Sequence, residues 1–333
     1  MAVYNEASDV SNPRSGLRLS DIPAHDPYVW VDMQAGVYYL YTSGIPKFTC
    51  MERYGVLTYR SNDLLEWEGP YVVFTVPDNV WAHPMHGTWA PEVHAYEGRF
   101  YLFVTLHNRM RPLEDNNTIP IAKHWRGTAI AVSDSPEGPF ELIREDAPVI
   151  DPSRMTLDGT LFVDEQKKPW MVYCHEWIQT IDGTIDAAPL SDDLREAIGE
   201  PIRLFNASEA TWDTGGPAEG YDGKVYVTDG CQLYRKQDGS LLMLWSSYDN
   251  GQYVQTIARS ESGKLQGPWK QLEPLVHGDS GHGMLFHTLE GELMLILHQP
   301  FDMPQSRCKL YLMEEAGEGL TVVKSCEHLH GEL

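Results

Sequence analysis

The sequence has few of the residues and motifs that mark several large classes of protein. Its five cysteines are odd in number, widely spaced and never arranged as a Cys-x-x-Cys pair, so neither a disulfide framework nor a zinc knuckle is expected. No apolar run approaches the roughly 20 residues that span a membrane. The first residues lack the basic and apolar regions of a secretory signal, which predicts a cytoplasmic protein.

Basic residues are also scarce. Lysine and arginine together number 25 against 48 aspartates and glutamates, which gives a formal net charge of -23. Such a charge disfavours nucleic acid and anionic membranes as partners, so a neutral or cationic ligand is expected. A glycine-rich phosphate loop, a Gly-x-Ser-x-Gly elbow and a His-Glu-x-x-His pair are all missing, which leaves nucleotide binding, serine hydrolysis and zinc proteolysis without support.

The chain does contain one pattern five times: a polar or ionisable residue, an apolar strand, an acidic or glycine-bearing turn, and an aromatic-rich strand. The five copies cover residues 26–42, 91–105, 157–173, 228–245 and 281–297. Each copy reads as a β-hairpin. A repeat of about 50 to 70 residues with several short strands is typical of propeller blades. We therefore expect an all-β fold, a five-bladed β-propeller, with residues 1–333 forming a single catalytic domain.

The polar residues that open the five units form the candidate site, because the first strand of each propeller blade lies nearest the central axis. They are Asp26, Glu92, Asp158, Asp229 and His282. Four of the five are carboxylates, and like charges that converge raise one another's pKa, which suits acid–base chemistry. Other aspartates stand beside turns and are assigned to them: Asp164, Asp182, Asp222 and Asp238.

Tryptophan and histidine flank these units. Trp89 precedes Glu92, and Trp177 lies in a His-Glu-Trp segment with Glu176. Exposed aromatic rings around carboxylates suit a carbohydrate, whose ring faces stack while its hydroxyl groups form hydrogen bonds. The other interpretation, packing between blades, is expected for Trp67, Trp170, Trp245 and Trp269. For Trp89 and Trp177 both interpretations stay open.

Three motifs resemble the five-bladed β-propeller glycosidases of glycoside hydrolase family 43. They are Ile22-Pro-Ala-His-Asp26, Trp89-Ala-Pro-Glu-Val93 and Leu157-Asp158-Gly-Thr-Leu-Phe162. The resemblance implies that Asp26 is a general base and that Asp158 tunes the pKa of a general acid. Together with the repeat and its flanking aromatic residues, these motifs lead us to expect substrate binding by His25, Trp89, Glu92, Trp177 and His282.

One motif departs from the family pattern. The family's general acid is usually a glutamate in a Glu-Gly-Pro motif, whereas this chain has Asp229-Gly-Cys231. Aspartate reaches about 1.5 Å less far. Three explanations are open: Asp229 is a shorter acid, Glu176 supplies the proton, or the protein only binds sugar. Glu219 is a weaker alternative acid.

The resemblance further implies inverting hydrolysis, with the base and the acid roughly 6.5 to 9.5 Å apart. We expect an exo-acting enzyme that releases a pentose from a pentose-containing oligosaccharide. An α-L-arabinofuranosidase is favoured, because the chain ends soon after residue 324 without the sandwich domain of many β-xylosidases. A β-xylosidase, an endo-arabinanase, a non-catalytic carbohydrate-binding propeller and a protein scaffold are the alternatives.

A metal is a further expectation. His282 resembles the family histidine that, in many members, touches a bound calcium ion or its water shell. A single imidazole among waters predicts a weak, largely hydrated calcium site. The alternative role for His282 is a neutral hydrogen-bonding plug of the central channel.

Overall fold

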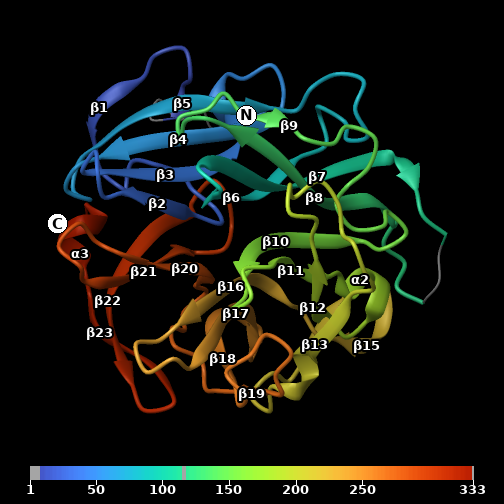
Figure 1. The fold of residues 1–333 in the computed structure, drawn as a ribbon. Helices are drawn as coiled ribbons and strands as arrows, with labels where there is room; N and C mark the ends of the chain where they lie inside the picture. The colour runs from blue at the N-terminus through green and yellow to red at the C-terminus, as the bar shows by residue number, and fades with distance from the viewer. Residues whose placement is uncertain (1–7, 115–117, 332–333) are drawn as a thin grey trace.

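The computed structural model describes residues 8–114 and 118–331, which form five antiparallel sheets around a central axis (Figure 1). Blade I has the strand order β1-β5-β4-β3-β2. Its strands are β1 (Arg14–Leu17), β2 (Tyr28–Asp32), β3 (Val37–Gly44), β4 (Gly55–Ser61) and β5 (Trp67–Thr75). The fold is therefore the predicted five-bladed β-propeller.

The other four blades are four-stranded meanders whose strands follow the chain order. Blade II has β6 (Thr88–Tyr96), β7 (Arg99–Pro112), β8 (His124–Ser133) and β9 (Glu141–Leu142). Blade III has β10 (Thr156–Val163), β11 (Pro169–His175), β12 (Thr184–Pro189) and β13 (Ile202–Asn206). Blade IV has β16 (Asp229–Arg235), β17 (Leu241–Asp249), β18 (Gln252–Ser260) and β19 (Trp269–Gln271). Blade V has β20 (Gly281–His287), β21 (Leu293–Gln299), β22 (Arg307–Ala316) and β23 (Gly319–Ser325).

Short elements lie in loops within the blades, between blades III and IV, and after the last strand. They are α1 (Pro46–Thr49), α2 (Trp177–Thr180), η2 (Ala207–Glu209), the hairpin of β14 (Gly216–Ala218) and β15 (Tyr221–Val225), and α3 (Glu327–His330). The last helix joins the two ends of the ring, because the His330 carbonyl accepts a hydrogen bond from the Ser20 amide (2.8 Å) while Nε2 of His330 accepts one from the Leu310 amide (2.8 Å). Among the described residues no helix is long and apolar enough to cross a membrane.

The first strands of the blades form the inner ring. β2, β6, β10, β16 and β20 each contact the next strand in this series, and β20 contacts β2. Each sheet packs against its neighbours, because an isolated blade cannot bury both of its faces. The tryptophans assigned to packing lie in or against the hydrophobic core; Trp67 and Trp245 are fully buried.

A repeated backbone distortion sets the site. At the start of every inner strand one residue has a left-handed backbone, with φ of 51° at Asp26, 43° at Ala90, 53° at Asp158, 57° at Gly230 and 49° at His282. In blades II to V the strand pairing shifts register across this residue, which is the mark of a β-bulge that re-aims a side chain.

This alignment corrects part of the sequence interpretation. Asp26, Asp158 and His282 occupy equivalent positions, as predicted. Glu92 instead lies two residues after the distorted Ala90, and Asp229 lies one residue before the distorted Gly230. The sequence repeat was too irregular to show this offset, because a bulge adds a residue to one strand without changing its hydrophobic pattern.

Gly230→Ala tests the distortion. A Cβ at this position would lie 2.9 Å from Cγ and 3.0 Å from Cα of His282. Gly239 also has a left-handed backbone, but a Cβ added there would meet nothing within 4 Å. We expect Gly239→Ala to lower the free energy of unfolding by about 1–2 kcal/mol and Gly230→Ala by a further 1–3 kcal/mol or so. Chemical denaturation would measure both, and equal losses would contradict the crowding at His282.

Candidate active site

A cavity of about 750 Å³ opens over the starts of the inner strands. Its polar lining includes His25, Asp26, Arg126, Asp158, Glu176 and Asp229. Its apolar lining includes Tyr54, Trp89, Trp177, Val225, Tyr248 and Phe301. This size lies within the range of roughly 300–1,000 Å³ for pockets that enclose a small ligand. Residues from all five blades or their connections thus meet around one hollow.

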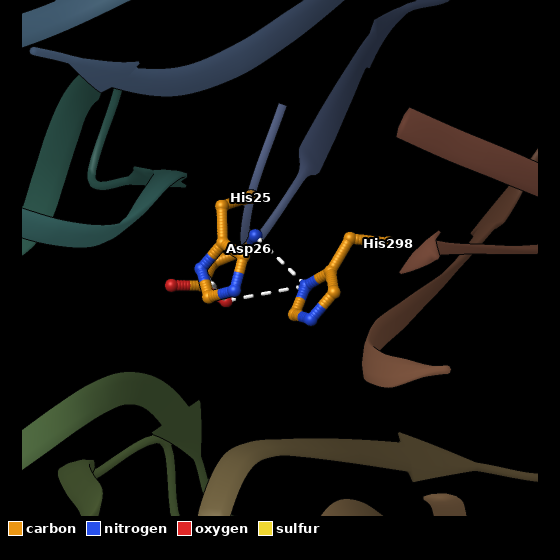
Figure 2. A group of neighbouring side chains, drawn as sticks. All are labelled: His25, Asp26 and His298. Atoms are coloured by element: carbon orange, nitrogen blue, oxygen red, sulfur yellow. Dashed lines mark hydrogen bonds and ion pairs between the residues drawn. The ribbon is translucent and has the colours of Figure 1, made fainter. Parts of the chain in front are cut away.

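Asp26 lies among three imidazole rings, two of which Figure 2 shows. Its Oδ1 is 3.1 Å from Nδ1 of His25, 3.1 Å from Nδ1 of His282 and 3.4 Å from Nδ1 of His298. The Asp26 amide also donates a hydrogen bond to Nδ1 of His298 (3.2 Å). Burial alone would raise the pKa of Asp26, but His25 and His282 outweigh it and lower that pKa well below its ordinary value.

The same environment shifts the pKa values of His25 and His298 in opposite directions. Burial lowers the pKa of His25, but the adjacent Asp26 carboxylate raises it, and the pKa is raised overall. Burial and His25 lower the pKa of His298 to about 4. Asp26 is therefore ionised and faces a neutral His298 on one side and a more basic His25 on the other.

Asp158 and Asp229 form a second group across the axis. Ligand atoms of these two residues and of His282 all lie within 4.8 Å of one another. Oδ2 of Asp158 accepts a hydrogen bond from the Gly230 amide (3.0 Å), and the Tyr253 hydroxyl donates one to Oδ2 of Asp229 (2.8 Å). Burial and the adjacent Asp229 raise the pKa of Asp158 well above its ordinary value, so Asp158 keeps its proton to a higher pH than an ordinary aspartate.

His282 lies between the two groups of acids. Its Nδ1 is 3.1 Å from Oδ1 of Asp26, 3.9 Å from Oδ2 of Asp158 and 3.8 Å from Oδ1 of Asp229. The oxygens of Asp26 and Asp229 that face this nitrogen are therefore at most about 7 Å apart. Asp26 and Asp158 are both buried at the shared cavity, as the sequence interpretation requires.

Most of the other predicted site residues also line the cavity. His25, Trp89, Glu176 and Trp177 do so. Glu92 does not; it is buried beneath in the central channel, where its Oε2 is 2.8 Å from Nε2 of His94. The prediction that Glu92 lies with the converging acids at the substrate cavity is therefore wrong. Glu92 follows the left-handed Ala90 by two residues, and its side chain points into the channel.

The weaker alternative acid, Glu219, also lies away from the cavity lining. It is exposed in the turn between β14 and β15. Glu219 was an alternative acid only because its Glu-Gly pair is similar to the start of the family's Glu-Gly-Pro motif.

Glu176 has a partner that the sequence did not reveal. Arg126, in β8 of blade II, forms a buried ion pair with it from Nη1 to Oε2. Burial lowers the pKa of Arg126 to about 9 although Asp158 raises it, so the guanidinium stays charged at neutral pH. Arg126, His298 and Tyr253 are site residues that sequence reasoning missed, because they lie in outer strands without a repeated motif.

The space beside His282 bears on the expected calcium ion. The channel cavity that His282 shares with Asp26, Glu92 and Gln232 has a volume of only about 10 Å³. Such a space holds about one water molecule. A largely hydrated calcium ion does not fit this space. A calcium site at His282 stays a prediction.

The fold and the buried carboxyl groups around a sugar-sized cavity define a β-propeller glycosidase. The sequence model described as glycosyl hydrolases family 43 matches residues 21–310. The chain therefore belongs to glycoside hydrolase family 43 and is a glycoside hydrolase, as its sequence motifs predicted. No curated protein sequence matches the chain.

Solved structures of this family are similar to the chain over nearly its whole length. An endo-arabinase from Bacteroides thetaiotaomicron VPI-5482 has 35% identity and a TM-score of 0.79, with 92% of this chain and 99% of that chain covered. An endo-1,4-beta-xylanase from the same organism has 24% identity and a TM-score of 0.70, covering 93% and 97%. An alpha-L-arabinofuranosidase from Lactobacillus brevis has 17% identity and a TM-score of 0.67, covering 90% and 93%, and supports the fold alone.

Asp158→Asn tests the electrostatics of the site. The folded state raises the pKa of Asp158, so the free energy of unfolding decreases as pH rises above the ordinary carboxyl pKa. The uncharged amide of asparagine does not ionise and therefore removes that decrease. We expect Asp158→Asn to raise the free energy of unfolding at pH 7 by on the order of 1 kcal/mol, with a smaller gain near pH 4.

The matched variant is Asp26→Asn. The lowered pKa of Asp26 stabilises the folded protein above the ordinary carboxyl pKa, and this contribution is lost as pH falls. Asp26→Asn should therefore destabilise at pH 7. Thermal denaturation between pH 4 and pH 8 measures both variants, and the same sign of change in the two would refute the assignment.

Proposed function

We propose that the protein hydrolyses α-L-arabinofuranosyl linkages in oligosaccharides, acting from a chain end and inverting the anomeric centre. The observation that supports this most is the arrangement of the three aspartates: an ionised Asp26 faces the adjacent carboxyl groups of Asp158 and Asp229 across His282. The similarity to an endo-arabinase at 35% identity favours arabinose over xylose as the sugar.

Asp26 would be the general base. It lines the cavity and keeps its charge at neutral pH, since His25 and His282 lower its pKa. A carboxylate that activates water must be ionised when the substrate arrives. His298 fixes the backbone of Asp26 through the hydrogen bond from the Asp26 amide, which orients the carboxylate.

Asp229 would be the general acid and Asp158 its positioning partner. The side chain of Asp229 is 21% exposed to the cavity, whereas that of Asp158 is 3% exposed. The substrate therefore meets Asp229 first. The closeness of Asp158 disfavours a negative charge on both carboxyl groups, and a proton kept by one of the two is the condition for protonating a leaving oxygen.

Glu176 fits the acid's role less well. Its ion pair with Arg126 is buried on both sides, so Glu176 is held in its charged form. A carboxylate paired with a guanidinium has no proton to donate to a leaving group. The substitution of the family's glutamate by Asp229 is thus better explained by a shorter acid than by a transfer of the role to Glu176.

An endo-acting arabinanase is the second candidate. The solved structure at 35% identity is named an endo-arabinase, and the cavity is larger than one pentose needs. The products distinguish the two: free arabinose from the first turnover indicates exo action, whereas longer fragments from linear arabinan indicate endo action.

The acid and the base are tested by three amide variants assayed on a panel of nitrophenyl pentosides and arabino-oligosaccharides. Asp26→Asn should lower kcat by about 100-fold or more on every substrate that the enzyme cleaves. Asp229→Asn should lose as much on oligosaccharides, but much less on a dinitrophenyl glycoside, whose leaving group needs no proton.

Glu176→Gln is the control for the acid. Compared on a nitrophenyl and a dinitrophenyl glycoside of the same pentose, neither of which has a leaving sugar, its loss of kcat should not depend on the leaving group. Such a dependence in Glu176→Gln but not in Asp229→Asn would exchange the two roles. If no substrate in the panel is cleaved while arabinose or xylose still raises the Tm, the non-catalytic carbohydrate-binding alternative replaces hydrolysis.

The stereochemical outcome gives an independent check. Inversion requires space for a water molecule between the base and the anomeric carbon, with carboxyl groups roughly 6.5 to 9.5 Å apart. We expect proton NMR of the first products from an α-linked substrate to show the β-anomer before mutarotation. An α-anomer at early times would mean retention and would make Asp26 a nucleophile.

A further inference from the structure

The part of the cavity between blades II and III contains an ion pair that the cleavage step does not use. Arg126 comes from β8, the third strand outward in its blade, and Glu176 follows β11. Neighbouring strands lie about 4.8 Å apart, so the backbone of β8 lies roughly 10 Å further from the axis than that of β6. Within residues 8–114 and 118–331, neither side chain forms an ion pair with the three aspartates of the catalytic centre.

The Arg126 guanidinium is fixed on three sides. Nη1 pairs with Glu176, Nε donates a hydrogen bond to Nδ1 of His107 (3.3 Å), and the group lies over the ring of Trp89 at 4.7 Å. It forms no other hydrogen bond with the described part of the chain. Because a guanidinium carries five N–H groups, donors remain free at a side chain that lines the cavity.

Stability alone does not account for this pair. Removing two charges from water costs several kcal/mol per ion, and apolar residues of similar size often serve as well. The pair is also next to two aromatic rings, Trp89 and Trp177, which line the same cavity, and Trp89 is 37% exposed. A fixed donor beside exposed aromatic faces is the arrangement that binds a sugar ring.

We propose that Arg126, positioned by Glu176, forms with Trp89 a second sugar subsite that binds the hydroxyl groups of the residue next to the cleaved pentose. This inference rests on the proposed function. The ligand is a neutral sugar, because the charges of Arg126 and Glu176 cancel and the nearby Asp158–Asp229 pair disfavours an anionic one. The cavity of about 750 Å³ has room for a ligand of more than one pentose.

Arg126→Lys tests the subsite. Lysine keeps a cation for Glu176, so the fold is retained, but it loses the planar fork and its stacking on Trp89. Calorimetry in an Asp26→Asn background measures the binding of α-linked arabinotriose without turnover. We expect Arg126→Lys to raise the Kd by about 10- to 100-fold. In the active enzyme, the ratio of kcat/KM for arabinotriose to that for nitrophenyl α-L-arabinofuranoside should fall by a similar factor.

Arg60→Lys is the matched control. Arg60 pairs with Glu68 at 2.9 Å and lies 4.7 Å from the ring of Tyr71, but it is in blade I and away from the cavity lining. This variant should leave both the Kd and the ratio unchanged. The subsite is refuted if Arg126→Lys binds arabinotriose as tightly as its parent. It is also refuted if kcat/KM falls by the same factor for arabinotriose and for nitrophenyl α-L-arabinofuranoside. If the Asp26→Asn protein binds no arabinotriose at all, the proposed function fails and the subsite with it.

Discussion

The site depends on one backbone constraint: a left-handed residue at the start of each inner strand. Four of the five residues are not glycine, and such conformations cost on the order of 1–3 kcal/mol each unless the surroundings hold them. The surroundings here are the neighbouring inner strands, whose contacts close the ring. The left-handed residues of blades I, III and V aim three ionisable side chains, Asp26, Asp158 and His282, at one point near the axis.

The closeness of these side chains then determines their pKa values. The carboxyl groups of buried Asp26, buried Asp158 and half-buried Asp229 lie near one imidazole nitrogen, and they cannot all be ionised to the same extent. Asp26 gains the histidine rings and has a lowered pKa, whereas Asp158 gains a second carboxyl group and has a raised pKa. Residues of a single type thus have opposite pKa shifts on the two sides of His282. The burial that accompanies these shifts is also what makes the site costly to the stability of the fold.

Much of the fold was predictable from local pattern, because hairpins with alternating apolar residues form by contacts within one blade. The five predicted hairpins correspond to the first two strands of the five blades. The acids of blades I and III were also placed correctly, since Asp26 and Asp158 are themselves the left-handed residues. Glu92 was misplaced because a bulge shifts which side chain faces the cavity without altering the pattern of apolar residues.

The sequence by itself determined the number of blades, the acidic character and the aspartates that open the inner strands, because these follow from the repeat and its composition. Only the tertiary structure decided that Glu176 is bound to Arg126 and that His298 supports Asp26. Glu176 and Arg126 are 50 positions apart, and Asp26 and His298 are 272 apart. Their meeting depends on how whole blades pack around the axis, and no local pattern records that geometry.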